Sequence, residues 1–539
     1  MSVAVSLSFS VTVIVFTPYD IFLGNSTDFI FSFSDFWWIV ALFGLLVFAF
    51  LTSVLVLLPV KLSALLATFV FSFTFCAYIQ RMFLNLYITS MVGNMLDIYE
   101  HPIWCVINIC IWIGIIFGAI LLLIYKKQIW KSTILIGSTA LIFVQSVAML
   151  SVALTQDLSK QAGPFITKDG MFELGASHNI IVFILDHYDF SYLETVRADD
   201  PTFYDSLDGF TLFDNTSSVY SRTYPSLIYL MTGIEENYHT EPYNECVESA
   251  FDNTSFLPDL QDLGFKINAY TLEHYIGSRG KTLIDNYKVT DRVINEKKLL
   301  LEMLRCSFYF EMPYALKPYF WFHDEFNYAI ENAYDKDDSE TYRDLVQKRL
   351  SIGDYQSSYK LIHMRGAHSP YQLNAAAQKV PSGVASEEQW KGCVIIVKEY
   401  LEQMKTLGLY DEATIIITAD HGAMNLNGNL ESPVWPIMFV KPANAARAPL
   451  KTSHAPTSHT DLFPTIIEAA GGEYEPYGTP IFSIAEEEDR ERLFYYSEIC
   501  TQGETEEITY KIRGNIKDFS SWKEISSTKI TNSMYAVAQ

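Results

Sequence analysis

The stretch NIIVFILD (179–186) decides the fold of this 539-residue chain. An unbroken apolar run of this length that ends in an acid is typical of a parallel strand buried on both faces, with a carboxylate at its carboxyl end. A second run, ATIIITADHG (413–422), ends in Asp420 and His421 in the same way. Ligands of open α/β sheets gather at the carboxyl ends of the strands. We therefore expect Asp186 and Asp420 to face one crevice.

The chain from residue 178 onward alternates strand-like runs with helical patterns, which predicts an α/β domain with a largely parallel sheet. The segment 255–271 shows this directly: an amphipathic helix, a glycine and then a strand. Residues 388–408 are helical in pattern and lead into the second run. We expect the charged, aromatic segment 280–350 to form a helical insertion. The other strand-like runs are FKINAYT (265–271), SSYKLIHM (357–364) and WPIMFV (435–440).

The N-terminal third is strongly apolar and predicts about five membrane-spanning helices. Each stretch has about 20 residues or somewhat more, the length that a lipid bilayer requires. The first stretch lacks a basic leader and a small-x-small cleavage site, so we interpret it as a retained helix. The predicted spans lie near 3–22, 37–59, 63–86, 103–125 and 131–155.

The few basic residues of this region predict the orientation in the membrane. Lys126, Lys127 and Lys131 lie between the fourth and fifth spans, and Lys61 lies between the second and third. Loops with basic residues stay on the cytoplasmic side. We therefore expect a multi-pass plasma-membrane protein whose N-terminus is cytoplasmic and whose α/β domain is extracytoplasmic.

These patterns divide the chain into four parts. Residues 1–155 form a transmembrane helical domain and 156–177 a polar linker. Residues 178–485 form the α/β domain, and 486–539 form a small antiparallel subdomain. Within the last part, we expect the charged stretch EEEDRER (486–492) to form a helix ahead of the strands.

The charge of the outer part limits its partners. The formal net charge is −24, and residues 1–160 contribute none of it because they hold six basic and six acidic residues. An outer part this acidic is poorly suited to nucleic acid or to docking on anionic lipid surfaces. Acidity is equally what a solvated exterior face carries. We expect no nucleic-acid partner.

Thr223 lies at the predicted start of a helix, in the stretch TYPSLIYLMTG (223–233). Pro225 and Ser226 suit a first helical turn. A hydroxyl at a helix N-terminus lies among free backbone N–H groups and positive dipole, which suits a phosphate or sulfate. Considered alone, Thr223 is as readily explained as a helix cap.

Asp186, Thr223, Asp420 and His421 together predict a divalent-cation site with a nucleophile beside it. Each residue has an ordinary structural alternative, because strand-end aspartates often cap the next helix and a single histidine is more often packed than ligating. The joint occurrence of all four residues favours the cation site. Four oxygen and nitrogen ligands suit Mn, Mg or Zn without distinguishing them.

With these residues in this chain order, the outer domain resembles the alkaline phosphatase and sulfatase superfamily. In that superfamily a strand-end acid, a nucleophile at a helix start and a later Asp-His pair bind the metal. The sulfatase motif C/S-x-P-S-R corresponds here to Thr223-Tyr224-Pro225-Ser226-Leu227. The ending HTDLFPTIIEAAG (459–471) resembles the superfamily's D-x-x-P-T-hydrophobic helix. The resemblance covers roughly residues 178–500.

The departures from the sulfatase motif bear on the reaction. Sulfatases convert a Cys or Ser into formylglycine, an aldehyde that threonine cannot become, and Leu227 replaces the motif's Arg. Thr223 and the five spans resemble instead the membrane-bound lipoteichoic acid synthases and phosphoethanolamine transferases. Those branches usually have Glu where this chain has Asp186, and the cysteines here do not support the disulfides of the second branch. The resemblance therefore implies that this chain is related to both branches, and it assigns neither named activity to the chain.

The resemblance implies a membrane-anchored phosphotransferase that depends on one divalent ion. Thr223 would take a phosphoryl-linked headgroup from a phospholipid donor and pass it to a cell-surface lipid or glycan. One alternative is a metal-dependent phosphodiesterase, phosphatase or sulfatase-like hydrolase that uses water. The other is an inactive scaffold with the same fold.

Four further residues are candidates for substrate binding. His368, in HMRGAHSPY (363–371), resembles the superfamily's histidine that contacts substrate. Arg222 adjoins the nucleophile but can point away from it, and His363 also fits a packed strand residue. His459 suits contact with phosphate or a second metal ion. We expect one ion, because no clear Asp–x–x–x–His element is present for a second.

Overall fold

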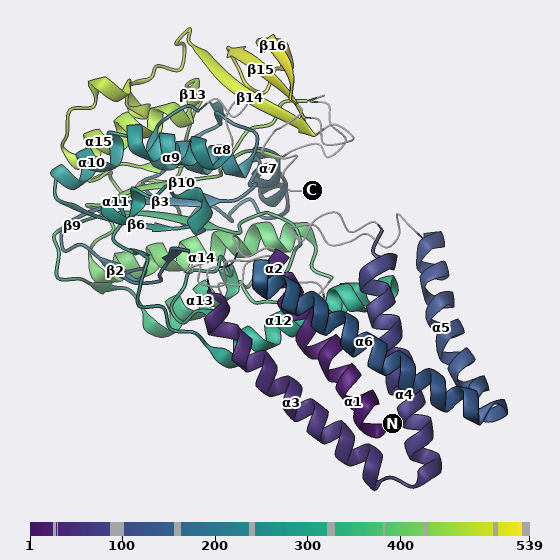
Figure 1. Cartoon of the computed structure of the whole chain (residues 1–539). Helices are drawn as coiled ribbons and strands as arrows, with labels where there is room; N and C mark the ends of the chain where they lie inside the picture. The colour runs from purple at the N-terminus through teal and green to yellow at the C-terminus, as the bar shows by residue number, and fades with distance from the viewer. Residues whose placement is uncertain are drawn as a thin grey trace. The chain divides into compact units, whose positions relative to one another are not determined.

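The computed structural model describes most of the chain, which divides into two compact units (Figure 1). Unit 1 comprises Met1–Pro164 and Thr290–Glu331, and unit 2 comprises Phe165–Val289 and Asn332–Gln539. The described residues are 1–24, 29, 31–86, 102–155, 163–236, 243–320, 329–380, 383–423, 430, 432–499 and 505–530.

Among its described residues, unit 1 has five helices that are long and apolar enough to cross a membrane, as the sequence predicts. Many of their large apolar side chains are exposed, including Phe50 and Phe143, each 68% exposed. Such exposure is stable where lipid replaces water around the helices. The spans are Ser2–Gly24 (α1, Ser2–Phe9; a π-helical stretch, Ser10–Phe16; α2, Thr17–Gly24), α3 (Phe33–Leu57), Val60–Leu84 (α4, Val60–Ile79; a π-helical stretch, Gln80–Leu84), α5 (Pro102–Tyr125) and α6 (Lys127–Thr155).

We expected 280–350 to form a helical insertion in the outer domain, but its central part, Thr290–Glu331, belongs to unit 1. It contains α12 (Glu296–Glu311) and a 3-10 helix, Tyr314–Phe320. The Thr17 hydroxyl donates to Glu311 Oε1 at 2.5 Å, and the backbone N–H of Tyr314 donates to Asn108 Oδ1 at 3.2 Å. Apolar residues of α12 are also buried in one cluster with residues of α2 and α3. The segment is therefore part of the helical unit.

Unit 2 is built on a seven-stranded, mostly parallel sheet, which confirms the predicted α/β class. Only β11 runs antiparallel to its neighbours. All five strand-like runs of the sequence are strands of this sheet, and Ile180–Leu185 of β3 are each at most 2% exposed. The order is β12 (Lys451–Ser453), β4 (Thr211–Phe213), β11 (Met438–Lys441), β10 (Thr414–Thr418), β3 (His178–Leu185), β9 (Ser357–Met364) and β6 (Phe265–Tyr270).

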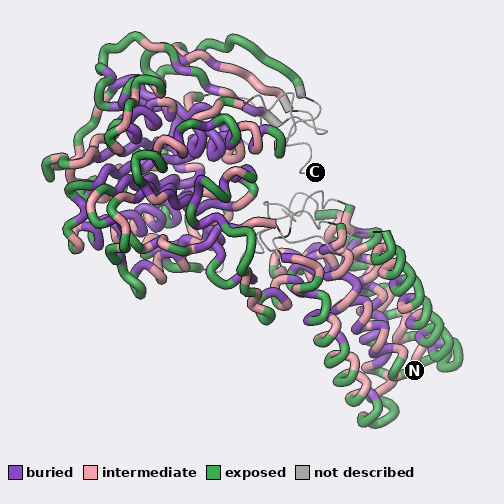
Figure 2. The backbone as a smooth tube through the Cα atoms, turned by 60° about the vertical axis from the view of Figure 1, so that its left-hand side comes forward, coloured by how far each residue is buried: buried purple, intermediate pink, exposed green. Residues whose placement is uncertain are grey.

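Helices cover both faces of the sheet (Figure 1), and the buried backbone is concentrated in the sheet between them (Figure 2). On one side lie α13 (Asp338–Lys348) and α14 (Ser386–Leu407), and α7 (Phe190–Asp199) packs against α14. On the other lie α8 (Thr223–Thr232), α9 (Tyr243–Asn253), α10 (Phe256–Asp262) and α15 (Leu462–Ala470). Short elements complete the unit: α11 (Gly280–Leu283), β1 (Phe165–Ile166), β2 (Glu173–Leu174), β5 (Thr216–Ser217), β7 (Tyr287–Lys288), β8 (Ser351–Ile352) and β13 (Thr457–Ser458).

The C-terminal part forms the expected antiparallel sheet, made of β14 (Glu491–Ile499), β15 (Thr505–Arg513) and β16 (Trp522–Ile530). The helix predicted for EEEDRER (486–492) was wrong, because this stretch forms turns and then enters β14. Its side chains find partners outside a helix. Arg490 pairs with Asp461, and Arg492 is buried on the Asn215 and Gly514 carbonyls. The stretch also has no apolar face, so a helix there would gain little from packing.

Candidate metal centre and active site

The two acids at the strand ends lie at the same level of the sheet. β3 and β10 are parallel neighbours in which Ile184 pairs with Thr418, so Asp186 and Asp420 both follow two residues later. The carboxylates are 2% and 0% exposed. Burying two carboxylates side by side is costly unless a cation or hydrogen-bond donors compensate their charge.

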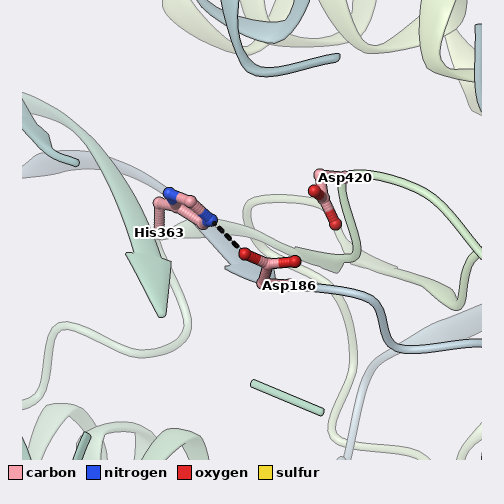
Figure 3. A group of neighbouring side chains, drawn as sticks. All are labelled: Asp186, His363 and Asp420. Atoms are coloured by element: carbon pink, nitrogen blue, oxygen red, sulfur yellow. Dashed lines mark hydrogen bonds and ion pairs between the residues drawn. The ribbon is translucent and has the colours of Figure 1, made fainter. Parts of the chain in front are cut away.

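His363 completes a buried group of three with these acids (Figure 3). It lies on β9, opposite Ile184 of β3, and its Nε2 is 3.2 Å from Asp186 Oδ2. One ligand-type atom from each residue lies within 4.8 Å of the others. Gly366, just beyond β9, makes the close packing of the strand ends possible. A Cβ there would lie 2.5 Å from the Asp186 backbone nitrogen.

The atoms still available to a cation can be read from the hydrogen bonds. His363 Nε2 is engaged, because it also lies 3.3 Å from the Lys336 ammonium nitrogen. Asp420 Oδ1 accepts backbone N–H groups of His187 and His421 at 2.8 and 2.9 Å. Within the described part of the chain, Asp186 Oδ1 and Asp420 Oδ2 are buried and accept no hydrogen bond, although Asp420 Oδ2 lies 3.3 Å from His421 Nε2. Two orphaned carboxylate oxygens in one buried group fit a hard divalent cation.

Thr223 and His421 lie against this group. The Thr223 hydroxyl oxygen is 3.2 Å from His421 Nε2. His421 Nδ1 is 2.7 Å from the Gly422 carbonyl oxygen, which can only accept, so in the neutral ring Nδ1 carries the hydrogen and Nε2 presents its lone pair. Thr223 is the first residue of α8, and Arg222 occupies the capping position without a side-chain cap. The hydroxyl therefore faces His421 at a helix N-terminus.

The two carboxylates have pKa values shifted in opposite directions. Burial raises the pKa of Asp186, but the Lys336 ammonium and the nearby histidines outweigh it and hold the pKa well below its usual range. Burial and the negative charge of Asp186 raise the pKa of Asp420. Burial, aided by Lys336, lowers the pKa of His363 to about 4, so this ring is neutral near pH 7. Perturbed titrations of this kind cluster at functional sites.

The predicted substrate-binding residues differ in the contacts that they make. The half-buried His368 ring lies 5.8 Å from that of His187, which is 5.3 Å from that of His421. His459 is buried, and its Nε2 is 3.2 Å from the Thr418 hydroxyl below the end of β10. The Arg222 guanidinium donates to the Ser497 carbonyl on β14 at 3.0 Å. His368 thus borders the centre, and His459 lies close enough to His421 for the charge of that ring, after burial, to lower its pKa to about 3. The substrate-binding roles of His459 and Arg222 remain predictions.

Three residues at the centre were missed by the sequence analysis. Lys336 contacts Asp186, and His187 holds Asp420 from a left-handed backbone position with φ of 61°. Asp189 caps α7 and accepts the backbone N–H groups of Ala423 and Trp435. It thereby fixes the backbone of Ala423, two residues after His421, and that of Trp435. Only their closeness to Asp186 in sequence could have drawn attention to His187 and Asp189, and Lys336 gave no signal.

No family model matches the sequence, and no curated protein matches it. Solved structures with a similar arrangement include a protein of the alkaline phosphatase superfamily from Vibrio parahaemolyticus (14% identity, 67% of this chain and 84% of that one, TM-score 0.38). A phosphonate monoester hydrolase from Silicibacter pomeroyi matches at 13% identity (65% and 88%, TM-score 0.35). The 2-O GAG sulfatase BT1596 matches at 11% (64% and 84%, TM-score 0.38). Because these values are low, a function has to follow from the residues of the site.

Proposed function

We propose that this chain is a membrane-anchored, metal-dependent phosphotransferase of the alkaline phosphatase and sulfatase superfamily. It would move a phosphoryl-linked headgroup from a phospholipid donor to a cell-surface lipid or glycan through a covalent intermediate on Thr223. The observation that carries the proposal is the Thr223 hydroxyl, 3.2 Å from His421 Nε2 at the start of α8, beside two carboxylates with orphaned oxygens.

The cation would be held by Asp186 Oδ1, Asp420 Oδ2, His421 Nε2 and the Thr223 hydroxyl oxygen. A bound divalent ion would supply positive charge beside the nucleophile and the phosphoryl oxygens. The donor atoms suit Mn, Mg or Zn. Two contacts would hold these ligands in place: the His187 backbone N–H donates to Asp420, and Asp189 accepts the backbone N–H of Ala423, two residues after His421.

The reaction would proceed in two displacements. The Thr223 oxygen attacks the phosphorus of a phosphodiester, and the bond from phosphorus to the lipid alcohol breaks. The Thr223 hydroxyl loses its proton in this step, the leaving alcohol gains one, and Thr223 then carries the headgroup phosphate. An acceptor hydroxyl then attacks the phosphorus and loses its proton, which releases the Thr223 hydroxyl. The free backbone N–H groups at the start of α8 would bind the phosphoryl oxygens.

The membrane helices support a lipid donor, since a tethered site meets lipids at high local concentration. We propose a plasma-membrane location with unit 2 extracytoplasmic, on the basis of the basic loops. In a chain whose native cysteines are replaced by serine, Lys127→Cys should react with an impermeant maleimide only after permeabilisation. Lys523→Cys should react in intact cells. The reverse labelling would contradict this topology.

Intact-mass analysis tests the covalent step. We expect the purified full-length protein, exposed to Mn²⁺ and mixed phospholipids, to gain a headgroup-phosphate adduct on the Thr223 peptide. Thr223→Ala should remove the adduct and lower turnover by on the order of 10³-fold or more, as loss of a nucleophile does. The matched control is Ser226→Ala, whose hydroxyl lies in the same helix but bonds the Tyr220 carbonyl oxygen. This variant should keep the adduct on Thr223.

The products separate the alternatives. Headgroup transferred to a lipid or glycan supports a transferase, whereas free phosphorylated headgroup indicates a hydrolase with the same nucleophile. If no metal gives an adduct or lipid turnover, the transferase proposal fails. The inactive scaffold would then be favoured.

A further inference from the structure

Lys336 places a buried ammonium group directly on a proposed metal ligand. Its Nζ donates to Asp186 Oδ2 at 2.8 Å and lies 3.3 Å from His363 Nε2. The Lys336 and Asp186 side chains are 9% and 3% exposed. A desolvated ammonium is stable only when it is paired, so this contact is a built part of the site.

The backbone around Lys336 is anchored to the end of β9. The Tyr334 hydroxyl donates to the His363 carbonyl oxygen at 2.6 Å. The backbone N–H groups of Arg365 and Gly366 donate to the two carboxylate oxygens of Asp338, at 2.9 and 3.0 Å. Lys336 itself has a φ of 52°, a left-handed conformation that costs a non-glycine residue free energy. These bonds on both sides hold the lysine at the site.

We propose that Lys336 sets the charge of the cation site. By holding Oδ2 of Asp186, the ammonium leaves Oδ1 for the divalent cation. Two ionised carboxylates balance a divalent cation, and Lys336 then leaves the loaded site with one excess positive charge. This charge attracts an anionic phosphodiester and stabilises charge on its transferring oxygens. It also weakens the hold on the cation. The part that concerns the phosphodiester rests on the function proposed above, and the part that concerns the cation does not.

Lys336→Met distinguishes this role from a structural one, because the proposal predicts effects of opposite sign. Mn²⁺ binding to the full-length protein in detergent, measured by calorimetry, should become tighter by on the order of tenfold, the effect of one neighbouring charge on a charged site. The unfolding temperature should rise more on adding Mn²⁺ than it does in the wild type. At saturating Mn²⁺, kcat/KM for bis(4-nitrophenyl) phosphate should fall at least tenfold.

Two variants control the experiment. Lys360→Met removes another buried lysine on β9, which bonds the Gly170 carbonyl oxygen, and should leave the Mn²⁺ affinity unchanged. Lys336→Arg keeps the charge and should restore the wild-type affinity. If Lys336→Met does not fold, Lys336→Gln replaces it with the same expectations.

Unchanged or weaker Mn²⁺ binding in the methionine or glutamine variant would overturn the proposal and leave Lys336 a packing role. Tighter binding with undiminished kcat/KM would overturn its phosphodiester part. If the wild type turns over no phosphodiester, the proposed function fails, and the Mn²⁺ affinity still decides the charge role of Lys336.

Discussion

Each of the two units buries a carboxylate with one orphaned oxygen, but only one of the two has the surroundings of a cation site. In unit 2, Asp186 Oδ1 accepts no hydrogen bond from the described residues, and in unit 1 the same holds for Glu311 Oε2. The other oxygen is engaged in both, by Lys336 in the first case and by the Thr17 hydroxyl in the second. An orphaned buried oxygen therefore does not define a metal ligand by itself.

The difference lies in the charge state that the surroundings impose. Burial raises the pKa of Asp186, but Lys336, His368 and His363 together hold it well below its usual range. Burial raises the pKa of Glu311 to about 8, against the opposing effects of Thr17, Arg81 and Lys317. Glu311 can thus give up its charge by binding a proton, whereas Asp186 keeps its charge and lies beside a second carboxylate. A cation site needs carboxylates that stay ionised.

Asp420→Asn should produce the largest change in cation affinity. The asparagine can still accept the N–H groups of His187 and His421, but it replaces the orphaned oxygen by an NH₂ group that cannot bind a cation. We expect Mn²⁺ affinity to fall on the order of a hundredfold or more, since changes outside the ligand shell already cost 10–100-fold. Without metal, the variant should be at least as stable as the wild type, because two carboxylates no longer repel.

Calorimetry with Mn²⁺ and thermal unfolding in EDTA would measure these two effects. Asp214→Asn is the matched control, since Asp214 is buried in the same unit but pairs on both oxygens, with His454 and Lys517. It should leave Mn²⁺ binding unchanged. Equal losses of affinity in both variants would mean that neither carboxylate is a specific ligand, and the contrast with Glu311 would no longer hold.

The elements that could be predicted from the sequence are those with strong periodicity. The apolar runs that became the five spans and β3, β6, β9, β10 and β11 carry their own signal, because burial on all sides demands uninterrupted apolar residues. The same runs place Asp186 and Asp420 at one edge of the sheet. The proximity of Thr223 and His421 was expected only from their joint occurrence with the two acids and from the resemblance, and the structure places the two side chains 3.2 Å apart. Their roles as nucleophile and ligands remain predictions.

The rest depended on contacts that leave no local pattern. Lys336 reaches Asp186 from a loop in a left-handed conformation, within an acidic stretch that resembles any solvated loop. The segment Thr290–Glu331 is charged on one side and apolar on the other, and its membership in unit 1 follows only from what its apolar side contacts. The EEEDRER stretch (486–492) has good helix formers, but the partners of Arg490 and Arg492 lie elsewhere. Tertiary contacts override local preference in such stretches.

Glu311→Gln should have the smallest effect on the cation site of unit 2. It tests the contrast between Asp186 and Glu311 through the pH dependence of stability. Glu311 meets Thr17 on α2, Arg81 on the span Val60–Leu84, and Lys317, and Arg81 in turn pairs with Asp20. Between the ordinary pKa of 4.5 and about 8, the folded protein keeps a proton that the unfolded chain releases. Stability due to this group is therefore fully present below pH 4.5 and is lost as the pH rises through 8, by at most about 1.4 kcal/mol per pH unit.

Glutamine resembles the protonated carboxyl and does not titrate, so the variant should match the wild type near pH 5 and be the more stable protein at pH 8. Thermal unfolding in detergent at both pH values would measure the difference. Other titrating groups are common to both proteins, so their contributions to the difference cancel.

Glu302→Gln, in the same helix but partly exposed, should show no such gain in stability at pH 8. Mn²⁺ affinity should be unchanged. If the variant is no more stable than the wild type at pH 8, Glu311 is ionised in the fold. Its orphaned oxygen would then need a cation, as that of Asp186 does.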